Sequence, residues 1–216
     1  MDYVLREQER LQSRIRRYQS PDEHPFFPDA VETPILQPLQ YPKILHENDV
    51  NVNETIKKRY VTEILPEVCP PPREGHSGET QENFGSASTC DVNCLQALSR
   101  RIHYGKFVAE SKFRKEPERF VKMIKEKDLK GIDAAITDSA VEKKVLERLA
   151  LKVKTYGTDP ASPPNQSEPK IDVESVVSMY KVSLLPCAHI WAELMLSSTV
   201  SFLSPRWSRW TTLCNA

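Results

Sequence analysis

The sequence is poor in glycine and carries no net charge. It has only 6 glycines among 216 residues, against 17 prolines, and its 30 basic side chains balance 30 acidic ones. Tight hairpin turns depend on glycine, so this composition disfavours a sheet of short hairpins and favours helices joined by proline-marked connections. A neutral chain also lacks the basic surface with which proteins hold nucleic acids or anionic membranes. We therefore expect neither a nucleic acid nor a membrane among its partners.

Motifs for metals and for common cofactors are missing as well. The chain contains no glycine-rich phosphate loop, no dinucleotide-binding fingerprint, no H-E-x-x-H and no G-x-S-x-G. Its five cysteines form no C-x-x-C pair, and Cys90 and Cys94 have no second cysteine or histidine pair at zinc-finger spacing. We therefore expect no metal site, and reduced thiols of the kind that cytoplasmic proteins carry. The charged start, MDYVLREQER, resembles neither a signal nor a transit peptide, which is consistent with a cytoplasmic protein or with a fragment.

Helical periodicity is the main positive signal. Apolar residues recur three, four and seven positions apart, as they do on one face of a helix. The expected helices are residues 2–18, one capped by Asn51 or Asn53, and then 89–114, 117–125, 129–136, 139–156 and 173–180. Six prolines between residues 21 and 46 predict an extended connection there, and residues 70–88 and 160–169 are predicted to be loops. Because the sequence shows no strand alternation, the expected fold class is all-α.

The last stretch, residues 182–216, differs from the rest in composition. It holds all three tryptophans and two of the five cysteines, and Glu193 is its only acid. Residues 182–203 are apolar enough to suggest a membrane helix, but Pro186, His189 and several hydroxyl side chains interrupt them. We expect no spanning helix, and we interpret the tail as a divergent segment outside the native fold.

Arg101 and Lys112 stand eleven residues apart on the long expected helix. At 100° per residue their directions differ by about 20°, and they lie about 16 Å apart along the axis. Gly105 falls between them, where a glycine costs about 1 kcal/mol relative to alanine but lets another group approach the backbone. Two cations beside such a hollow suit a small dianion. Two solvated bases and a packing glycine also explain the spacing, and spacing alone favours this second interpretation.

Glu142 and the pair Arg16-Arg17 likewise have two interpretations. Ser139 and Glu142 have the spacing of a capping box, which gives the glutamate a structural role at the start of a helix. Arg16 and Arg17 precede Ser-Pro-Asp and can be an exposed basic helix end that complements the helix dipole. Without further information, the structural interpretation is the better one for Glu142.

Four motifs change this assessment. Residues 94–113, CLQALSRRIHYGKFVAESKF, closely resemble the signature helix of fungal and plant chorismate mutases. Residues 16–28, 83–87 and 139–149 resemble the same family, in the same order. The resemblance covers roughly residues 1–181, and four long motifs in the right order make a chance match negligible.

The resemblance implies a bundle of helices, normally a homodimer, that converts chorismate to prephenate at the start of phenylalanine and tyrosine biosynthesis. It also implies that the reaction uses no cofactor and forms no covalent intermediate. Such a Claisen rearrangement needs a compact conformer of chorismate and stabilisation of the charge on the breaking ether. Positioning and preorganised charges can supply both.

By the family pattern, Arg101 binds a substrate carboxylate through its planar guanidinium. Lys112 donates to the region of the carboxylate and the ether oxygen, and Glu142 hydrogen-bonds the substrate hydroxyl. Asp138 stands near a further polar contact one turn earlier, where the residue type departs from the commonest pattern. The resemblance therefore makes Arg101, Lys112, Glu142 and Asp138 the candidate catalytic residues.

Many fungal and plant members are activated by tryptophan and inhibited by tyrosine at a site on the dimer interface. The resemblance implies these two amino acids as effectors of this chain. The matching residues are Arg16 and Arg17, from the helix of that site, and Asn83, Gly85, Ser86 and Thr89, from the loop that contacts the effector's amino-acid group. Glu82 departs from an amide often found there, which leaves the sign and strength of regulation open.

We divide the chain accordingly. Residues 1–181 are an incomplete chorismate mutase domain and 182–216 are the divergent tail. Regulatory elements lie at about 14–28 and 82–89, and catalytic helices at about 89–114 and 138–156. Family members carry an upstream helix with another substrate-binding arginine, and a final helix with a threonine and a glutamate that line the site. Neither is found in this sequence, so we expect impaired turnover or, alternatively, a non-catalytic effector-binding or dimerisation fragment.

Overall fold

The structure, a computed structural model of the chain, describes residues 1–42, 44–45, 48, 50–68, 84–158 and 172–181. Every regular element in these residues is helical and none is a strand, which confirms the all-α fold class. None of the described helices is long and apolar enough to cross a membrane. The expectations about the tail of residues 182–216 lie outside the described residues.

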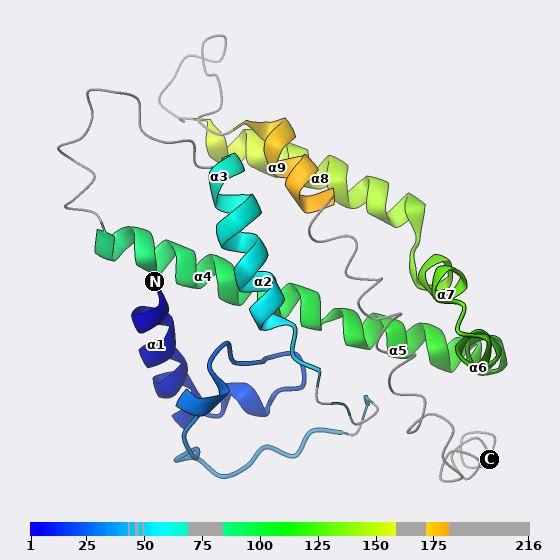
Figure 1. Cartoon of the computed structure of the whole chain (residues 1–216), viewed down its shortest axis with the longest axis horizontal. Helices are drawn as coiled ribbons and strands as arrows, with labels where there is room; N and C mark the ends of the chain where they lie inside the picture. Colours follow the sequence, from blue (N-terminus) through cyan, green and yellow to red (C-terminus); the bar gives the residue numbers. More distant parts are fainter. Residues whose placement is uncertain (43, 46–47, 49, 69–83, 159–171, 182–216) are drawn as a thin grey trace.

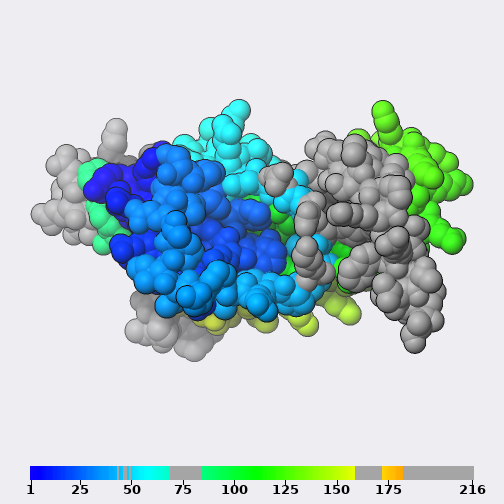
Figure 2. All heavy atoms as spheres, turned by 90° about the horizontal axis from the view of Figure 1, so that it is seen from below, coloured from blue at the N-terminus to red at the C-terminus, as the bar shows by residue number. Residues whose placement is uncertain are grey.

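The helices surround one long rod made of α4 and α5. The α-helices are α1 Asp2–Arg14, α2 Asn53–Arg59, α3 Leu65–Val68, α4 Phe84–His103, α5 Gly105–Lys115, α6 Pro117–Glu126, α7 Leu129–Ile136, α8 Ser139–Gly157 and α9 Val173–Met179. Figure 1 shows α1 on one side of the rod, α8 and α9 on the other, and α6 and α7 at the far end of α5. The N-terminal segment spreads over the side of the molecule seen in Figure 2. The last four helices match their expected ranges to within one residue.

The first helix is shorter than predicted. It ends at Arg14 instead of continuing to Tyr18, because Arg16 has a left-handed backbone with φ of 71° and Arg17–Gln19 forms a 3₁₀ turn. Few residues other than glycine adopt such a positive φ, and it cannot be part of an α-helix. The predicted helical conformation of the last residues of this segment was therefore wrong.

The inner face of α1 is partly polar. Leu11 and Ile15, which indicated the helix, are 65% and 62% exposed. The fully buried Glu9 instead accepts hydrogen bonds from the backbone N–H groups of Phe26 and Phe27, at 2.8 and 2.9 Å. This carboxylate holds the proline-rich connection against α1, so the apolar stripe faces away from the core of this chain.

The second helix begins at Asn53 and then changes its winding. Its N-cap residue is Val52, which makes no side-chain capping bond, so the predicted cap at Asn51 or Asn53 is wrong. The side-chain oxygen of Asn51, just before the cap, accepts a hydrogen bond from the N–H of Asn53 at 3.0 Å. After α2 the chain passes through a π-helical turn, Tyr60–Ile64, and continues into α3. Pro66 is the second residue of α3. Proline has no N–H and its ring crowds the preceding turn, so a widened turn before it relieves both problems.

The long helix expected at residues 89–114 is two helices. α4 begins five residues earlier than predicted and gives way to α5 at Tyr104. The carbonyl of Tyr104 accepts a hydrogen bond from the N–H of Phe107, three residues on, at 3.1 Å. Gly105 lies next to this tightened turn. The predicted rod is therefore present, but it has a break in its bonding pattern between Arg101 and Lys112.

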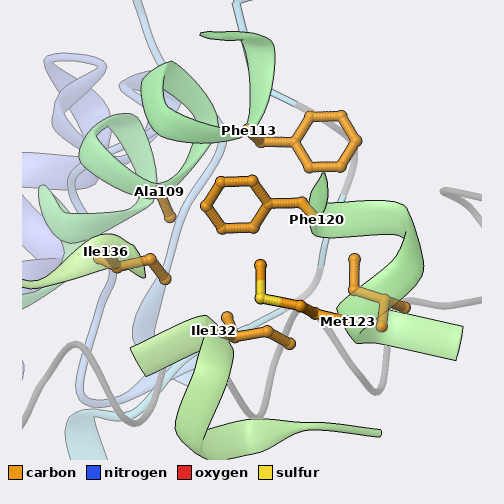
Figure 3. Close-up of a cluster of buried hydrophobic side chains, with 7 residues drawn as sticks. Ala109, Phe113, Phe120, Met123, Ile132 and Ile136 are labelled. Carbon is orange, nitrogen blue, oxygen red and sulfur yellow. The ribbon is translucent and has the colours of Figure 1, made fainter. Parts of the chain in front are cut away.

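Two apolar clusters pack on the rod. One joins α5, α6 and α7 and is drawn in Figure 3: Ala109, Phe113, Phe120, Met123, Ile124, Ile132 and Ile136. The other joins α1, the α2 region and α4: Leu5, Ile56, Tyr60, Ile64, Val92, Leu95 and Ile102. The rod is the element common to both, so its position is set by packing at both ends.

A buried polar cluster lies between them, at the junction of α4 and α5. The rings of His24 and His103 stack with centroids 4.2 Å apart, and Nζ of Lys106 donates to Nε2 of His24 at 2.9 Å. Nε2 of His103 accepts from the N–H of Val52 at 3.3 Å, and its Nδ1 donates to the carbonyl of Ser99 at 2.8 Å. In both rings Nε2 is an acceptor, so both histidines are neutral.

Burial keeps these rings neutral. It lowers the pKa of His24 to about 4, and the positive charge of Lys106 adds to the effect. Burial lowers the pKa of His103 to about 3, with contributions from His24 and Lys106. Both values lie below the ordinary 6.5, so the folded protein binds protons at these rings less readily than the unfolded chain does.

We therefore expect the free energy of unfolding to fall as the pH is lowered from about 6.5 towards about 4. The stabilisation by the neutral rings is complete above pH 6.5. Below that pH the imidazoles of the unfolded chain bind protons while those of the folded protein stay neutral, so the stabilisation is lost as the pH falls. Urea denaturation at fixed ionic strength measures it. The double variant His24→Gln/His103→Gln is the control, because its amides do not titrate while its carboxylates are unchanged. If the free energy of unfolding of the two proteins changed with pH in parallel, the lowered pKa values of His24 and His103 would be contradicted.

Candidate active site

The two candidate cations lie on either side of the break in the rod. Arg101 is in the last turn of α4 and is exposed, whereas Lys112 is in the last turn of α5 and is half-buried. The buried residues nearby, such as Ile102 and Ala109, belong to the clusters on the inner face. Among the described residues, no hydrogen bond or ion pair engages the side chain of Arg101 or Lys112.

Neighbouring cations on the rod have different surroundings. Nε of Arg100 lies 3.2 Å from a carboxylate oxygen of Asp22 and 3.5 Å from one of Glu23. Nε of Arg114 lies 2.7 Å from a carboxylate oxygen of Glu110. Arg101 is about 100° around the helix from Arg100 and points away from these acids. Its guanidinium is thus available to a ligand, whereas those of its neighbours are paired.

Asp138, not Ser139, caps α8. Its carboxylate accepts hydrogen bonds from the N–H groups of Ala140 at 3.1 Å and Val141 at 3.2 Å. Ser139 is already the first helical residue, so the capping box predicted between Ser139 and Glu142 is wrong. The structural role moves to Asp138, and the half-buried Glu142 has no capping function.

Arg16 and Arg17 lie just after α1, Arg16 with a left-handed backbone and Arg17 at the start of a 3₁₀ turn, and neither is in an α-helix as predicted. Arg17 is engaged within the chain: its Nε lies 2.7 Å from Glu23, and its Nη1 lies 2.8 Å from the side-chain oxygen of Gln96 on α4. Arg16 donates from Nη1 to the carbonyl of Gln37 at 2.6 Å. The buried Nε of Arg16 has no hydrogen-bond partner among the described residues, so one donor of this side chain is unsatisfied there.

The other candidate effector residues are at the start of α4. Gly85, Ser86 and Thr89 are exposed and belong to its first turns rather than to a loop, while Asn83 lies outside the described residues. The hydroxyl of Thr89 donates to the carbonyl of Gly85 at 3.0 Å. Eleven residues separate Gly85 from the Gln96 that Arg17 contacts, which is about 16 Å along the helix. A single chain therefore does not bring Arg17 next to Gly85.

The cluster of His24, His103 and Lys106 was not anticipated from the sequence. His103 and Lys106 are three residues apart and share a helix face with buried apolar residues, which is a signal for paired polar groups inside a core. Nothing in the sequence pairs them with His24, which comes from the proline-rich connection. In the part of the chain that the structure describes, no group of three or more side chains is arranged to hold a metal ion.

Comparison with known proteins identifies the family. The family described as chorismate mutase type II matches residues 84–182. The chorismate mutase of Emericella nidulans is 71% identical over 192 residues, which cover 88% of this chain and 71% of that protein. The crystal structure of the Candida albicans chorismate mutase in complex with L-Trp superposes with a TM-score of 0.83 at 42% identity, covering 96% of this chain and 77% of that one. AtCM1 with tyrosine bound in its allosteric site gives a TM-score of 0.76 at 36% identity, covering 90% and 76%. The chain belongs to the chorismate mutase family.

Proposed function

We propose that the chain is a chorismate mutase, an isomerase that rearranges chorismate to prephenate for the synthesis of phenylalanine and tyrosine. Chorismate carries two carboxylates, a ring hydroxyl and an enol ether. In the rearrangement the C–O bond of the ether breaks while a new C–C bond forms, and negative charge develops on the ether oxygen. The protein has to hold the substrate in a compact conformer and meet that charge with fixed donors.

Three side chains have the chemistry for these tasks. Arg101 offers a planar fork of donors that matches a carboxylate. Lys112 offers a compact ammonium that can follow the ether oxygen as its charge grows, and such an interaction raises the rate because it strengthens in the transition state. Glu142 can accept a hydrogen bond from the ring hydroxyl.

The observation that carries the proposal is the state of the two cations on the rod. Arg100 and Arg114 are paired with carboxylates, but Arg101 and Lys112 have no such partner in the described structure. Both side chains lie off the buried face of the rod. Glu116, one turn beyond Lys112, interacts with its charge, but no carboxylate of the described residues pairs with either cation. Two cations in this state can attract a small dianion.

Lys112→Ala should lower kcat/KM for chorismate by at least a hundredfold, about 2.7 kcal/mol, because it removes a donor to the developing charge. The midpoint of thermal unfolding should change little, since this ammonium has no ion-pair partner among the described residues. Lys115→Ala, an exposed lysine of the same helix, is the matched control. Wild-type kinetics for Lys112→Ala would make Lys112 a surface lysine. A chain that binds L-tryptophan but turns over no chorismate would instead be a non-catalytic effector-binding part.

Asp138 and Glu142 should separate stability from catalysis. Asp138→Ala removes the cap of α8 and should reduce the free energy of unfolding by about 1 kcal/mol. Glu142→Gln keeps the shape of the side chain, so it should leave stability nearly unchanged while lowering kcat/KM. Urea denaturation and steady-state kinetics on both variants test the division. If Asp138→Ala lost activity at full folded fraction, Asp138 would also contact the substrate.

We also propose that tryptophan and tyrosine regulate the enzyme at a site shared by two chains. The half-buried guanidinium of Arg16 can donate to the effector's carboxylate, and Gly85, Ser86 and Thr89 supply exposed groups on α4. The distance of about 16 Å along α4 argues that one chain provides the arginines and a second chain the start of α4. The exposed Leu11 and Ile15 of α1 are available to cover such an interface in a homodimer.

Arg16→Ala should weaken L-tryptophan binding at least tenfold while leaving the molecular mass in solution that of a dimer, because it removes a donor to the carboxylate. Isothermal titration and analytical ultracentrifugation measure the two quantities. Arg14→Ala, an exposed arginine at the end of α1, is the control. Unchanged tryptophan binding in Arg16→Ala, or tight binding by a monomer, would contradict the shared site.

A further inference from the structure

The break between α4 and α5 separates the two candidate catalytic cations, so its geometry decides how they face the same substrate. Arg101 stands three residues before Tyr104 and Lys112 eight residues after it. A continuous α-helix would fix both through its own hydrogen bonds. At Tyr104 the backbone stays right-handed and its N–H still bonds the carbonyl of Arg100 at 2.9 Å, but the next bond, from Phe107 to Tyr104, is three residues long. The rod's own hydrogen bonds are therefore less regular here, and contacts from outside the rod can contribute to aligning its two halves.

One short segment contacts the rod on both sides of this break. Before it, Arg100 is held by Asp22 at 3.2 Å and by Glu23 at 3.5 Å. After it, Lys106 donates to Nε2 of His24 at 2.9 Å. The consecutive residues Asp22, Glu23 and His24 thus contact the last turn of α4 and the first turn of α5.

The segment is itself anchored. The side-chain amide of Asn53 donates to the carbonyl of His24 at 2.8 Å, and the hydroxyl of Ser99 on α4 donates to the side-chain oxygen of Asn53 at 2.5 Å. Lys106 also donates to the carbonyl of Val50 at 2.9 Å. Asn53, Ser99, His103 and Lys106 are all buried, so these bonds are not in competition with solvent.

The contacts of this segment are off the face of the candidate site. With Arg101 as reference, Arg100 is about 100° to one side, Lys106 about 140° to the other side and Lys112 about 20° around the helix. The contacts of residues 22–24 can therefore set the angle between the two helices without occupying the face to which the substrate would bind.

We propose that residues 22–24 are a positioning clasp: by holding Arg100 and Lys106 on either side of Tyr104, they fix the placement of Lys112 relative to Arg101. His24 and Lys106 are positioning residues and do not touch the substrate. The inference rests on the proposed function, because alignment matters only if both cations act on one molecule. A displacement of about 1 Å can cost a hundredfold in rate, so a small change of helix angle is sufficient.

The test compares two substitutions of His24 in the full chain. His24→Leu removes the ring acceptor of Lys106 and leaves its bond to the carbonyl of Val50, whereas the side-chain oxygen of His24→Gln can reach the position of Nε2 and restore the lost bond. Ile64→Val, which removes one carbon from a buried residue of the π-helical turn, controls for general loss of stability. Steady-state kinetics are measured well below each unfolding midpoint, and amide hydrogen exchange is followed over residues 104–110.

His24→Leu should lower kcat at least tenfold with KM within about threefold, the pattern of an interaction lost chiefly in the transition state. Amide exchange over residues 104–110 should quicken at least tenfold, through local opening at the break. His24→Gln should recover most of both, and Ile64→Val should change neither. Equal effects of His24→Leu and His24→Gln, or of His24→Leu and Ile64→Val, would overturn the clasp. If the unaltered chain turns over no chorismate, the proposed function fails, and the exchange data alone support or overturn the clasp.

Discussion

The arrangement of this molecule depends on burying one face of the rod made of α4 and α5. Apolar side chains such as Val92 and Leu95 on α4, and Phe113 on α5, are fully buried against other helices. Because that face is turned inward, Arg101 and Lys112, which are at other positions around the helix, lie off it. The placement of the candidate site is therefore a consequence of core packing. The two cations can remain without an ion-pair partner because they are outside the core, where a charge does not have to be paired.

Polar contacts then decide the details that packing leaves free. The N-terminal connection is held to α1 by the buried carboxylate of Glu9 and to the rod by Asp22, Glu23 and His24. Glu23 contacts both Arg17 and Arg100, so a candidate effector arginine and the rod that carries the candidate catalytic cations share one acid. A shared, largely buried carboxylate offers a physical route by which the two regions can influence each other.

The start of α8 illustrates how a structural role and a chemical role can be confused. A capping box and a substrate contact both need a carboxylate in the first turn of a helix. The cap at Asp138 assigns the structural role to one residue and leaves Glu142 without it. Glu142 is therefore the residue of the two whose carboxylate has no structural explanation within the described chain.

The sequence by itself determined the helical class, the position of most helices and the family, because apolar periodicity, proline positions and the motif at residues 94–113 are local properties of the chain. It also identified Arg101, Lys112 and Glu142 as candidates, through resemblance rather than through spacing. Only the tertiary structure showed the early end of α1, the break at Tyr104 and the contacts of His24 with Lys106. Those features come from a left-handed residue, a shift in hydrogen bonding and a pairing between segments 82 residues apart, and none of these leaves a periodic trace in the sequence.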